Sequence, residues 1–265
     1  MKKAAFIGAG NMATAIIGGI YGAKLDIFLT VYDLDYDKLG HLKENYNVVP
    51  ASSIKDAICD VDCVFLAVKP QNFPDVLSEM KDGFPPNIVV ISIAAGITPE
   101  YISKALGVQA KVVQVMPNTP LLLGYGATAL SKSENVNEEE FAFVRKIFDC
   151  SGITAVLPKN KMNEVIAING STPAFIYRYA QCFINYGVSV GISEDTCLKL
   201  FAQTLIGSAK MMTDSGETLD KLIAMVSSKG GTTIAGLNAL EEKGLSTAVQ
   251  AACESSVKRA YELAK

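Results

Sequence analysis

Two glycines and an alanine, Gly8, Gly10 and Ala13, follow a short apolar run and precede a segment of helical character. A strand, a turn of the form G-x-G-x-x-A and a helix, in that order, are typical of a site for the pyrophosphate of a dinucleotide. Gly8 permits the tight turn, and Gly10 leaves bare backbone for a phosphate. The first helical turn, at Asn11 and Met12, presents free N–H groups to it. A plain strand–helix turn is the structural alternative.

A carboxylate stands where such a fold holds the adenosine ribose. The apolar run 27–32 predicts a second strand, and Asp33 follows it, about 20 residues after Gly10. A carboxylate there accepts a hydrogen bond from the 2′-hydroxyl of NADH and repels the 2′-phosphate of NADPH. We therefore expect NADH or NADPH as cofactor, with NADH slightly favoured. A solvated turn aspartate is the alternative, because Asp35 and Asp37 follow.

A second glycine turn lies near the C-terminus. Gly230 and Gly231 lead into a helix whose first turn holds Thr232 and Thr233. The N–H groups of such a turn form a concavity, and the helix N-terminus adds positive potential. With the Ser228 hydroxyl, the two threonines complete a cradle for a carboxylate. An ordinary glycine turn with a threonine N-cap explains the pattern equally well.

Three further strand ends carry small or polar residues, at positions 67–71, 92–96 and 116–120. Ligands of open α/β sheets bind at the carboxyl edge, so we expect these ends to line one cleft facing the nicotinamide. A solvated loop cation is the alternative for the one lysine among them. The residues assigned to the cofactor site from these ends are Val68, Lys69, Pro70, Ala95 and Asn118.

The reaction class is narrowed by the shortage of acid–base groups. A hydroxy-acid dehydrogenase needs a general acid–base, often His or Lys, for its alcohol proton. The single histidine, His41, lies in a charged helical segment that the pattern places away from these strand ends, and Lys210 fits a helix-surface cation better. A protonated C=N substrate is already a hydride acceptor, so its site needs position and a carboxylate anchor more than a strong acid.

Composition excludes several classes. The 265 residues are 49% apolar, and 24 basic and 27 acidic residues are well mixed to a net charge of −3. No basic stripe indicates nucleic acid, and no apolar stretch is long enough for a membrane span. The six cysteines form no C-x-x-C motif and the histidine stands alone, so we expect no metal site. We expect reduced cysteines and a cytoplasmic location.

The order of the elements predicts an α/β fold class. Residues 1–158 alternate strand and helix patterns, which indicates a doubly wound, Rossmann-type dinucleotide-binding domain. Residues 159–265 show helix after helix and predict an all-α domain. Its long helices are apolar on more than one face, and about one hundred residues make a small core. We therefore expect a homodimer, with a monomer packed only on the first domain as the alternative. The strands are predicted at Lys3–Ile7, Ile27–Tyr32, Val48–Val49, Cys63–Val68, Ile88–Ile93, Val112–Met116, Thr128–Leu130 and Ile153–Leu157.

The chain resembles the 1-pyrroline-5-carboxylate reductase family, which reduces a cyclic imine carboxylate to L-proline with NAD(P)H. The resemblance implies a helical dimerisation domain after the nucleotide domain, pentamers of dimers as a common assembly, and an active site shared between subunits. The matching stretches, in the family's order, are Phe6–Ala13, Ala67–Pro70, Ser92–Gly96, Met116–Pro120, Gly207–Met211 and Gly230–Ile234.

The resemblance also implies roles for residues. The helix start at Gly231, Thr232 and Thr233, with Ser228, would bind the substrate carboxylate, and Thr233 would lie near the ring nitrogen as a proton donor. Val68, Lys69 and Ala95 would line the cofactor. The chain departs from the family pattern at Lys229, where a proline is usual, and in the stretch that begins at Asn169.

Two other functions stay open. A β-hydroxyacid dehydrogenase shares the two-domain plan, but should carry a lysine in the first long helix of its second domain. There, residues 169–181 hold only Arg178 as a cation. The other is a non-catalytic, nucleotide-sensing relative of a reductase, against which the intact Gly231-Thr232-Thr233 argues.

Overall fold

The computed structural model describes residues 1–263, and these form two compact units. The first, here called the sheet unit, comprises Met1–Pro173 and the chain from Ser255 onward. The second, the helical unit, is Ala174–Glu254. The sequence predicts a change from strands to helices after Pro158, and the last strand does end just before that residue, at Val156. The sheet unit nevertheless continues to Pro173.

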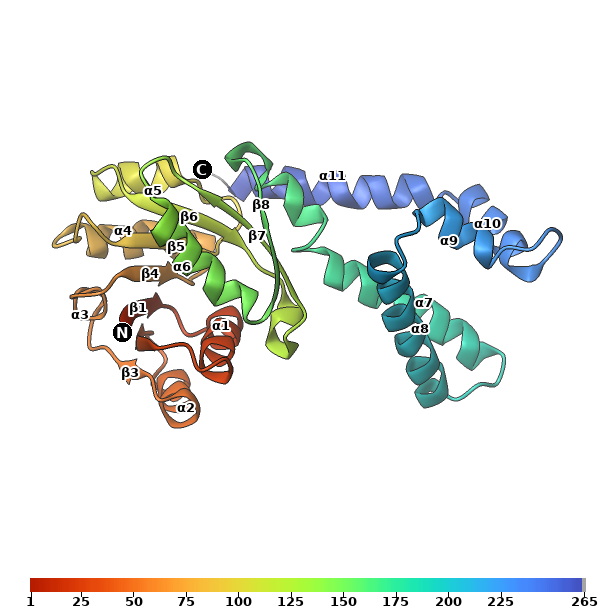
Figure 1. The fold of residues 1–265 in the computed structure, drawn as a ribbon, viewed down its shortest axis with the longest axis horizontal. Coiled ribbons are helices and arrows are strands. Elements are labelled where there is room, and N and C mark those ends of the chain that lie inside the picture. The colour runs from red at the N-terminus through yellow and green to blue at the C-terminus, as the bar shows by residue number, and fades with distance from the viewer. Residues whose placement is uncertain (264–265) are drawn as a thin grey trace. The chain divides into compact units, whose positions relative to one another are not determined.

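An eight-stranded sheet organises the sheet unit, in the order β3-β2-β1-β4-β5-β6-β7-β8. Strands β1 to β6 are all parallel to one another. The α/β class predicted from the sequence is confirmed, and every predicted strand run overlaps an observed strand (Figure 1). The strands are β1 (Lys2–Ile7), β2 (Ile27–Tyr32), β3 (Val49–Pro50), β4 (Cys63–Leu66), β5 (Val89–Ser92), β6 (Lys111–Met116), β7 (Gly126–Lys132) and β8 (Gly152–Val156).

Helices cover both faces of this sheet, as parallel strands require. Helices α1, α2 and α6 bury one apolar cluster, in which Phe6 and Phe65 stack with ring centroids 4.1 Å apart. Helices α3, α4 and α5 bury the other. The helices are α1 (Asn11–Gly22), α2 (Tyr36–Tyr46), α3 (Ile54–Ala57), α4 (Phe73–Lys81), α5 (Pro99–Leu106) and α6 (Glu138–Asp149), with 3-10 turns η1 (Pro70–Asn72), η2 (Thr119–Leu123), η3 (Lys159–Lys161) and η4 (Glu164–Ala167).

One pairing in the sheet departs from the repeating plan. Strand β7 runs antiparallel to β6, and β8 is parallel to β7. A parallel neighbour would need a long crossover, usually a helix. Only the short turn η2 connects β6 to β7, so the chain returns directly alongside itself.

The helical unit is built from α7 (Thr172–Ser189), α8 (Glu194–Asp214), α9 (Leu219–Met225), α10 (Thr232–Glu242) and part of α11 (Leu245–Leu263). Side chains cap the starts of α8 and α9, because the hydroxyls of Ser193 and Thr218 accept hydrogen bonds from the backbone N–H groups of Thr196 and Lys221. Phe183 and Phe201 stack between α7 and α8 with centroids 4.9 Å apart.

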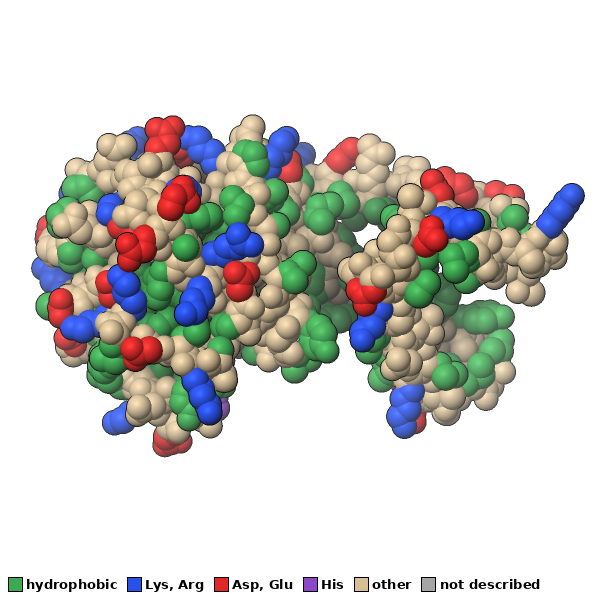
Figure 2. Space-filling model, viewed as in Figure 1, with side chains coloured by type: hydrophobic (Ala, Val, Ile, Leu, Met, Phe, Trp, Pro, Cys, Tyr) green, Lys and Arg blue, Asp and Glu red, His purple; other side chains and the backbone are tan. Residues whose placement is uncertain are grey.

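Many apolar side chains of the helical unit are exposed on its surface. Within Ala174–Glu254, Gly187 alone is buried. Leu200 is 65% exposed and Ile206 is 53% exposed. Figure 2 shows hydrophobic side chains on the surface of α7 and α8. Large apolar surfaces of this kind mark interaction sites. In the part of the chain that the structure describes, no helix is long and apolar enough to cross a bilayer.

Candidate dinucleotide and carboxylate sites

The order in which strands are added to the sheet reverses at β1, which pairs with β2 on one side and with β4 on the other. Open α/β sheets bind ligands at such a switch point. The Gly8–Gly10 turn follows β1, Asp33 follows β2, and Val68 follows β4. The structure therefore brings the predicted cofactor-binding residues of three strand ends to one edge of the sheet unit.

Gly8 occupies a position that no other residue fits. Its φ is +106°, and a Cβ there would lie 2.6 Å from the Ala67 carbonyl oxygen and 2.9 Å from the carbonyl carbon. Its N–H donates to the Tyr32 carbonyl at 2.8 Å. The tight turn predicted for Gly8 is thus held between the ends of β2 and β4.

Gly10 has the opposite surroundings, because an added Cβ would meet nothing within 4 Å. Gly10 is the N-cap of α1, which has no capping side chain and no acid in its first turn. By contrast, α2 to α6, α8 and α9 all carry an acid there. The first turn of α1 thus offers N–H groups that no side chain caps and carries no acid of its own, which fits a pyrophosphate.

Asp33 makes contacts that the sequence did not predict. One carboxylate oxygen accepts the Ala9 N–H at 2.6 Å, and the other accepts the Asp35 N–H at 2.9 Å. The carboxylate therefore ties the glycine turn to the end of β2. The register of β1 and β2 explains this contact: Ile7 pairs with Tyr32, so the residues that follow each of them lie close together.

A cavity of about 460 Å³ adjoins this turn, and Asn11, Asp35, Lys38 and His41 are among its lining residues. The Lys38 ammonium lies 2.9 Å from the Asp35 carboxylate. This contact lowers the pKa of Asp35 and raises that of Lys38. His41, which the pattern placed away from the later strand ends, lies beside the glycine turn. Its Nδ1 lies 3.2 Å from the Asn45 amide nitrogen.

The other cofactor candidates differ in their surroundings. Val68 and Ala95 are half-buried at the ends of β4 and β5, whereas Lys69 is exposed and Pro70 begins η1. Backbone and small side chains at such positions can line a planar ring. Asn118 is buried at 8% exposure.

Asn118 and Asn169 form a buried polar network. Asn118 accepts the Ala127 N–H at 2.9 Å and donates to the Asn169 carbonyl at 3.2 Å. Asn169 donates to the carbonyls of Met116 at 2.7 Å and Ala127 at 2.8 Å. These bonds fasten the end of β6 to β7 and to the chain before α7. The structure thus gives both amides a structural role, in which the Asn169 side chain uses its nitrogen for backbone carbonyls and leaves its buried oxygen without a partner.

The predicted substrate cradle lies in the helical unit, at the start of α10. Gly230 has φ +72°, and the Gly231 N–H donates to the Ser228 carbonyl at 2.9 Å. Gly231 is the N-cap, so Thr232 and Thr233 lie inside the first turn. Helix α10, like α1, has no capping side chain and no acid in that turn.

The cradle therefore has open N–H groups and exposed hydroxyls at Ser228, Thr232 and Thr233. A threonine N-cap, the alternative that the sequence left open, is absent from this turn. In residues 1–263, no group of three or more His, Cys, Asp or Glu side chains is placed to hold a metal ion.

Two family models match the chain. Residues 159–263 match the model described as pyrroline-5-carboxylate reductase dimerisation. Residues 3–96 match the model described as NADP oxidoreductase, coenzyme F420-dependent. The first begins where the strand pattern ends, and the second spans the glycine turn and the first five strands.

Relatives match over the full length. A pyrroline-5-carboxylate reductase of Escherichia coli is 36% identical, covering 100% of this chain and 99% of that protein. The crystal structure of Plasmodium falciparum pyrroline carboxylate reductase with NADP bound has a TM-score of 0.90 at 30% identity, covering 100% of this chain and 98% of that one. The enzyme from Coxiella burnetii has a TM-score of 0.90 at 32% identity, covering 99% and 98%.

The two roles of Asp33 are separable with Asp33→Ala. If the carboxylate chiefly holds the turn, the variant loses hydrogen bonds to two backbone N–H groups, and NADH and NADPH affinities fall by the same factor. We expect this result, together with a stability loss of about 1–3 kcal/mol. Fluorescence titration with each nucleotide and thermal melts measure both quantities.

The control is Asp26→Ala, which removes an exposed carboxylate at the start of β2. It should leave both affinities unchanged. A selective gain in NADPH affinity by Asp33→Ala would instead show that the carboxylate contacts the ribose.

Proposed function

Because the chain belongs to the pyrroline-5-carboxylate reductase family, we propose that it reduces the C=N bond of 1-pyrroline-5-carboxylate to L-proline. The observation that carries this proposal, beside the full-length relatives, is the pair of open helix N-termini. Helices α1 and α10 both begin at a glycine, without a capping side chain or an acid in the first turn. One suits a pyrophosphate and the other a carboxylate.

The cofactor site of this proposal is the switch point of the sheet. Gly8, Gly10, Asn11 and Met12 present the turn and the first N–H groups of α1, and Asp33 holds the turn in place. Val68, Lys69, Pro70 and Ala95 line the neighbouring strand ends. NADH or NADPH bound there supplies the hydride. Asp33 already accepts two backbone hydrogen bonds, so we propose that it holds the turn and does not itself select NADH over NADPH.

The substrate site is the start of α10. The backbone N–H groups after Gly230 and Gly231, with the hydroxyls of Ser228 and Thr232, bind the carboxylate of the cyclic imine. The Thr233 hydroxyl lies beside the ring nitrogen, where its oxygen accepts from the N–H of the protonated imine and its O–H donates to the lone pair of the amine once hydride has been transferred. Reduction turns a protonated imine into a secondary amine, so the nitrogen needs a partner that follows its changing charge. A hydroxyl meets this need without a histidine.

Association of two chains is part of the proposal. The exposed apolar faces of α7 and α8, together with the match of residues 159–263 to a dimerisation model, support a homodimer formed by the predicted domain 159–265. A pentamer of dimers is the larger assembly implied by the resemblance. A cytoplasmic location stays a prediction.

Purified protein should oxidise NAD(P)H when given 1-pyrroline-5-carboxylate, and should not reduce 2-keto acids. The reason is that the described site offers a carboxylate cradle and hydroxyls, while its predicted residues include no histidine acid. Absorbance of the reduced nicotinamide measures both reactions. Turnover of a keto acid with none of the imine would contradict the proposal, as would binding of nucleotide without any turnover.

Thr233→Val should lower kcat/KM by about ten- to a hundredfold, because it removes one hydrogen-bonding hydroxyl beside a charged group while keeping the side-chain shape. Its melting temperature should change little, since Gly231 and not Thr233 is the N-cap. The matched control is Thr218→Val, which removes a true N-cap in the same unit.

Thr218→Val should cost about 1 kcal/mol of stability and leave the kinetics unchanged. Kinetics of Thr233→Val equal to those of the unmodified enzyme would remove Thr233 from the reaction.

Light scattering should give at least twice the 28.2 kDa protomer mass at micromolar concentration. Leu200→Glu places a charge on the exposed apolar face of α8 and should shift the protein toward monomer, with loss of activity. Leu34→Glu, at a residue 82% exposed in the sheet unit, is the control and should leave the mass unchanged. A fully active monomer would contradict the proposed dimer.

A further inference from the structure

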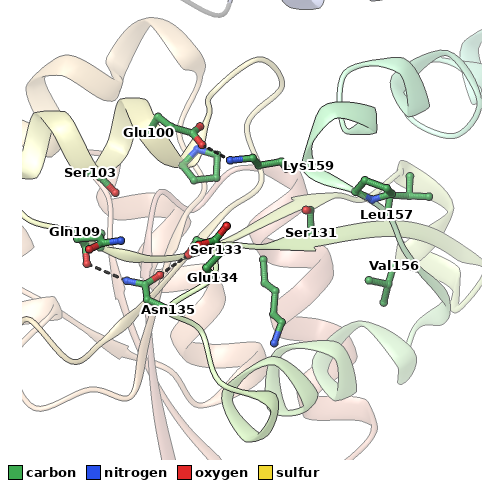
Figure 3. Close-up of a pocket in the computed structure, with 14 residues that line it drawn as sticks. Glu100, Ser103, Gln109, Ser131, Ser133, Glu134, Asn135, Val156, Leu157 and Lys159 are labelled. Carbon is green, nitrogen blue, oxygen red and sulfur yellow. Dashed lines mark hydrogen bonds and ion pairs between the residues drawn. The ribbon is translucent and has the colours of Figure 1, made fainter.

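A hollow runs along helix α5, and its lining residues include none of the predicted cofactor and substrate residues. Its larger part has a volume of about 560 Å³ and lies between α5, the end of β7 and the chain after β8 (Figure 3). A second part of about 290 Å³ adjoins it. Both parts share Pro99, Glu100 and Lys159 as lining residues. All the lining residues belong to the sheet unit.

Three buried polar side chains form a row across one face of the sheet, and two of them, Gln114 and Ser131, line this hollow. Ser92 pairs with Gln114 across β5 and β6, and Gln114 pairs with Ser131 across β6 and β7. The three are 0%, 3% and 5% exposed, although the other buried residues of this sheet face are apolar. Gln114 lines the smaller part and Ser131 the larger.

These side chains keep unused hydrogen-bonding capacity. The Ser92 hydroxyl is buried without a partner. The Gln114 amide nitrogen donates to the Ile97 carbonyl at 3.3 Å, which leaves its oxygen as an acceptor. Figure 3 shows the Ser131 hydroxyl with no bond to the other residues drawn. The Gln114 oxygen and the Ser131 hydroxyl therefore offer hydrogen-bonding capacity to a ligand in the hollow, and buried polar groups of this kind are nearly always bonded in proteins.

The two residues of one ion pair, Glu100 and Lys159, line both parts of the hollow. The Lys159 ammonium lies 2.9 Å from the Glu100 carboxylate, and their side chains are 65% and 64% exposed. Each partner shifts the other, so the pKa of Glu100 is lowered and that of Lys159 is raised. An exposed pair of this kind contributes little stability and opens readily.

The other charged residues that line the hollow, Lys132 and Glu134, do not form an ion pair with Glu100 or Lys159. Lys132 also lines the hollow, but its ammonium bonds to Glu138 at 2.6 Å and to the Val136 carbonyl at 3.1 Å. Glu134 lies near enough to Lys159 to raise its pKa. Lys159 is therefore the cation of the hollow that is free to exchange an exposed partner for a ligand.

We propose that this hollow is a binding site for a small zwitterionic α-amino acid, distinct from the reductase site. The ligand carboxylate takes the place of Glu100 on Lys159 and accepts from the Ser131 hydroxyl. The ligand ammonium takes the place of Lys159 on Glu100 and donates to the Gln114 oxygen. A ligand with one charge would leave one member of the opened pair uncompensated, whereas a zwitterion replaces both.

The test is equilibrium dialysis of radiolabelled L-serine against the full-length protein, with unlabelled acetate and ethylammonium as competitors. L-serine should bind saturably at millimolar concentration, and either single-charge competitor should displace it at least about tenfold less well than unlabelled L-serine. Ser131→Ala and Lys159→Gln should each weaken binding by about tenfold. Thermal melts establish that both variants remain folded.

Two control variants separate this site from others. Lys161→Gln removes a neighbouring exposed lysine that does not line the hollow, and should leave binding unchanged. Thr233→Val reports on the proposed carboxylate cradle, and should also leave it unchanged. Binding that responds to Thr233→Val but not to Ser131→Ala, equal competition by acetate, or no saturable binding would each overturn the proposal. None of these outcomes depends on reductase activity.

Discussion

The contact between Gly8 and the Ala67 carbonyl is the constraint on which the nucleotide site depends. A side chain at position 8 would lie 2.6 Å from that oxygen, so only glycine lets the end of β1 pass this close to the end of β4. The same residue donates to the Tyr32 carbonyl on the other side. Strand pairing therefore brings Asp33 against the Ala9 N–H, and the turn is shaped by the sheet before any nucleotide binds.

Helices α1 and α10 lack the stabilising side-chain cap that other helices of the chain have, and the N–H groups of their first turns stay open. Side-chain caps contribute about 1 kcal/mol, and most helices of the chain begin with one. At α1 and α10 a glycine stands in the capping position, so the first N–H groups remain free for a ligand. The absence of acids from both first turns keeps the helix potential positive. In the proposed function, the missing caps and acids are what fit these two helix starts for anions.

Local patterns made much of the fold predictable, and long-range packing explains the rest. Apolar runs predicted the strands, because a strand that is covered on both faces is apolar along its whole length. The antiparallel direction of β7 depends on the short connection through η2, which periodicity does not reveal. The Asn118–Asn169 network and the bond from Ala9 to Asp33 join residues far apart in sequence, so motif spacing alone could not identify them.

The rigidity of the proposed substrate cradle depends on how well the helical unit is packed. Its helices meet through a few aromatic contacts, such as Phe183 with Phe201, and within Ala174–Glu254 only Gly187 is buried. A unit that leaves residues such as Leu200 exposed has too little core of its own to hold α10 rigidly. In the proposed homodimer, burial of these faces would supply that rigidity, and the order of the carboxylate cradle would then rise with protomer concentration. The sheet unit, with apolar clusters on both faces, has no such dependence, so nucleotide binding should survive dissociation that abolishes turnover.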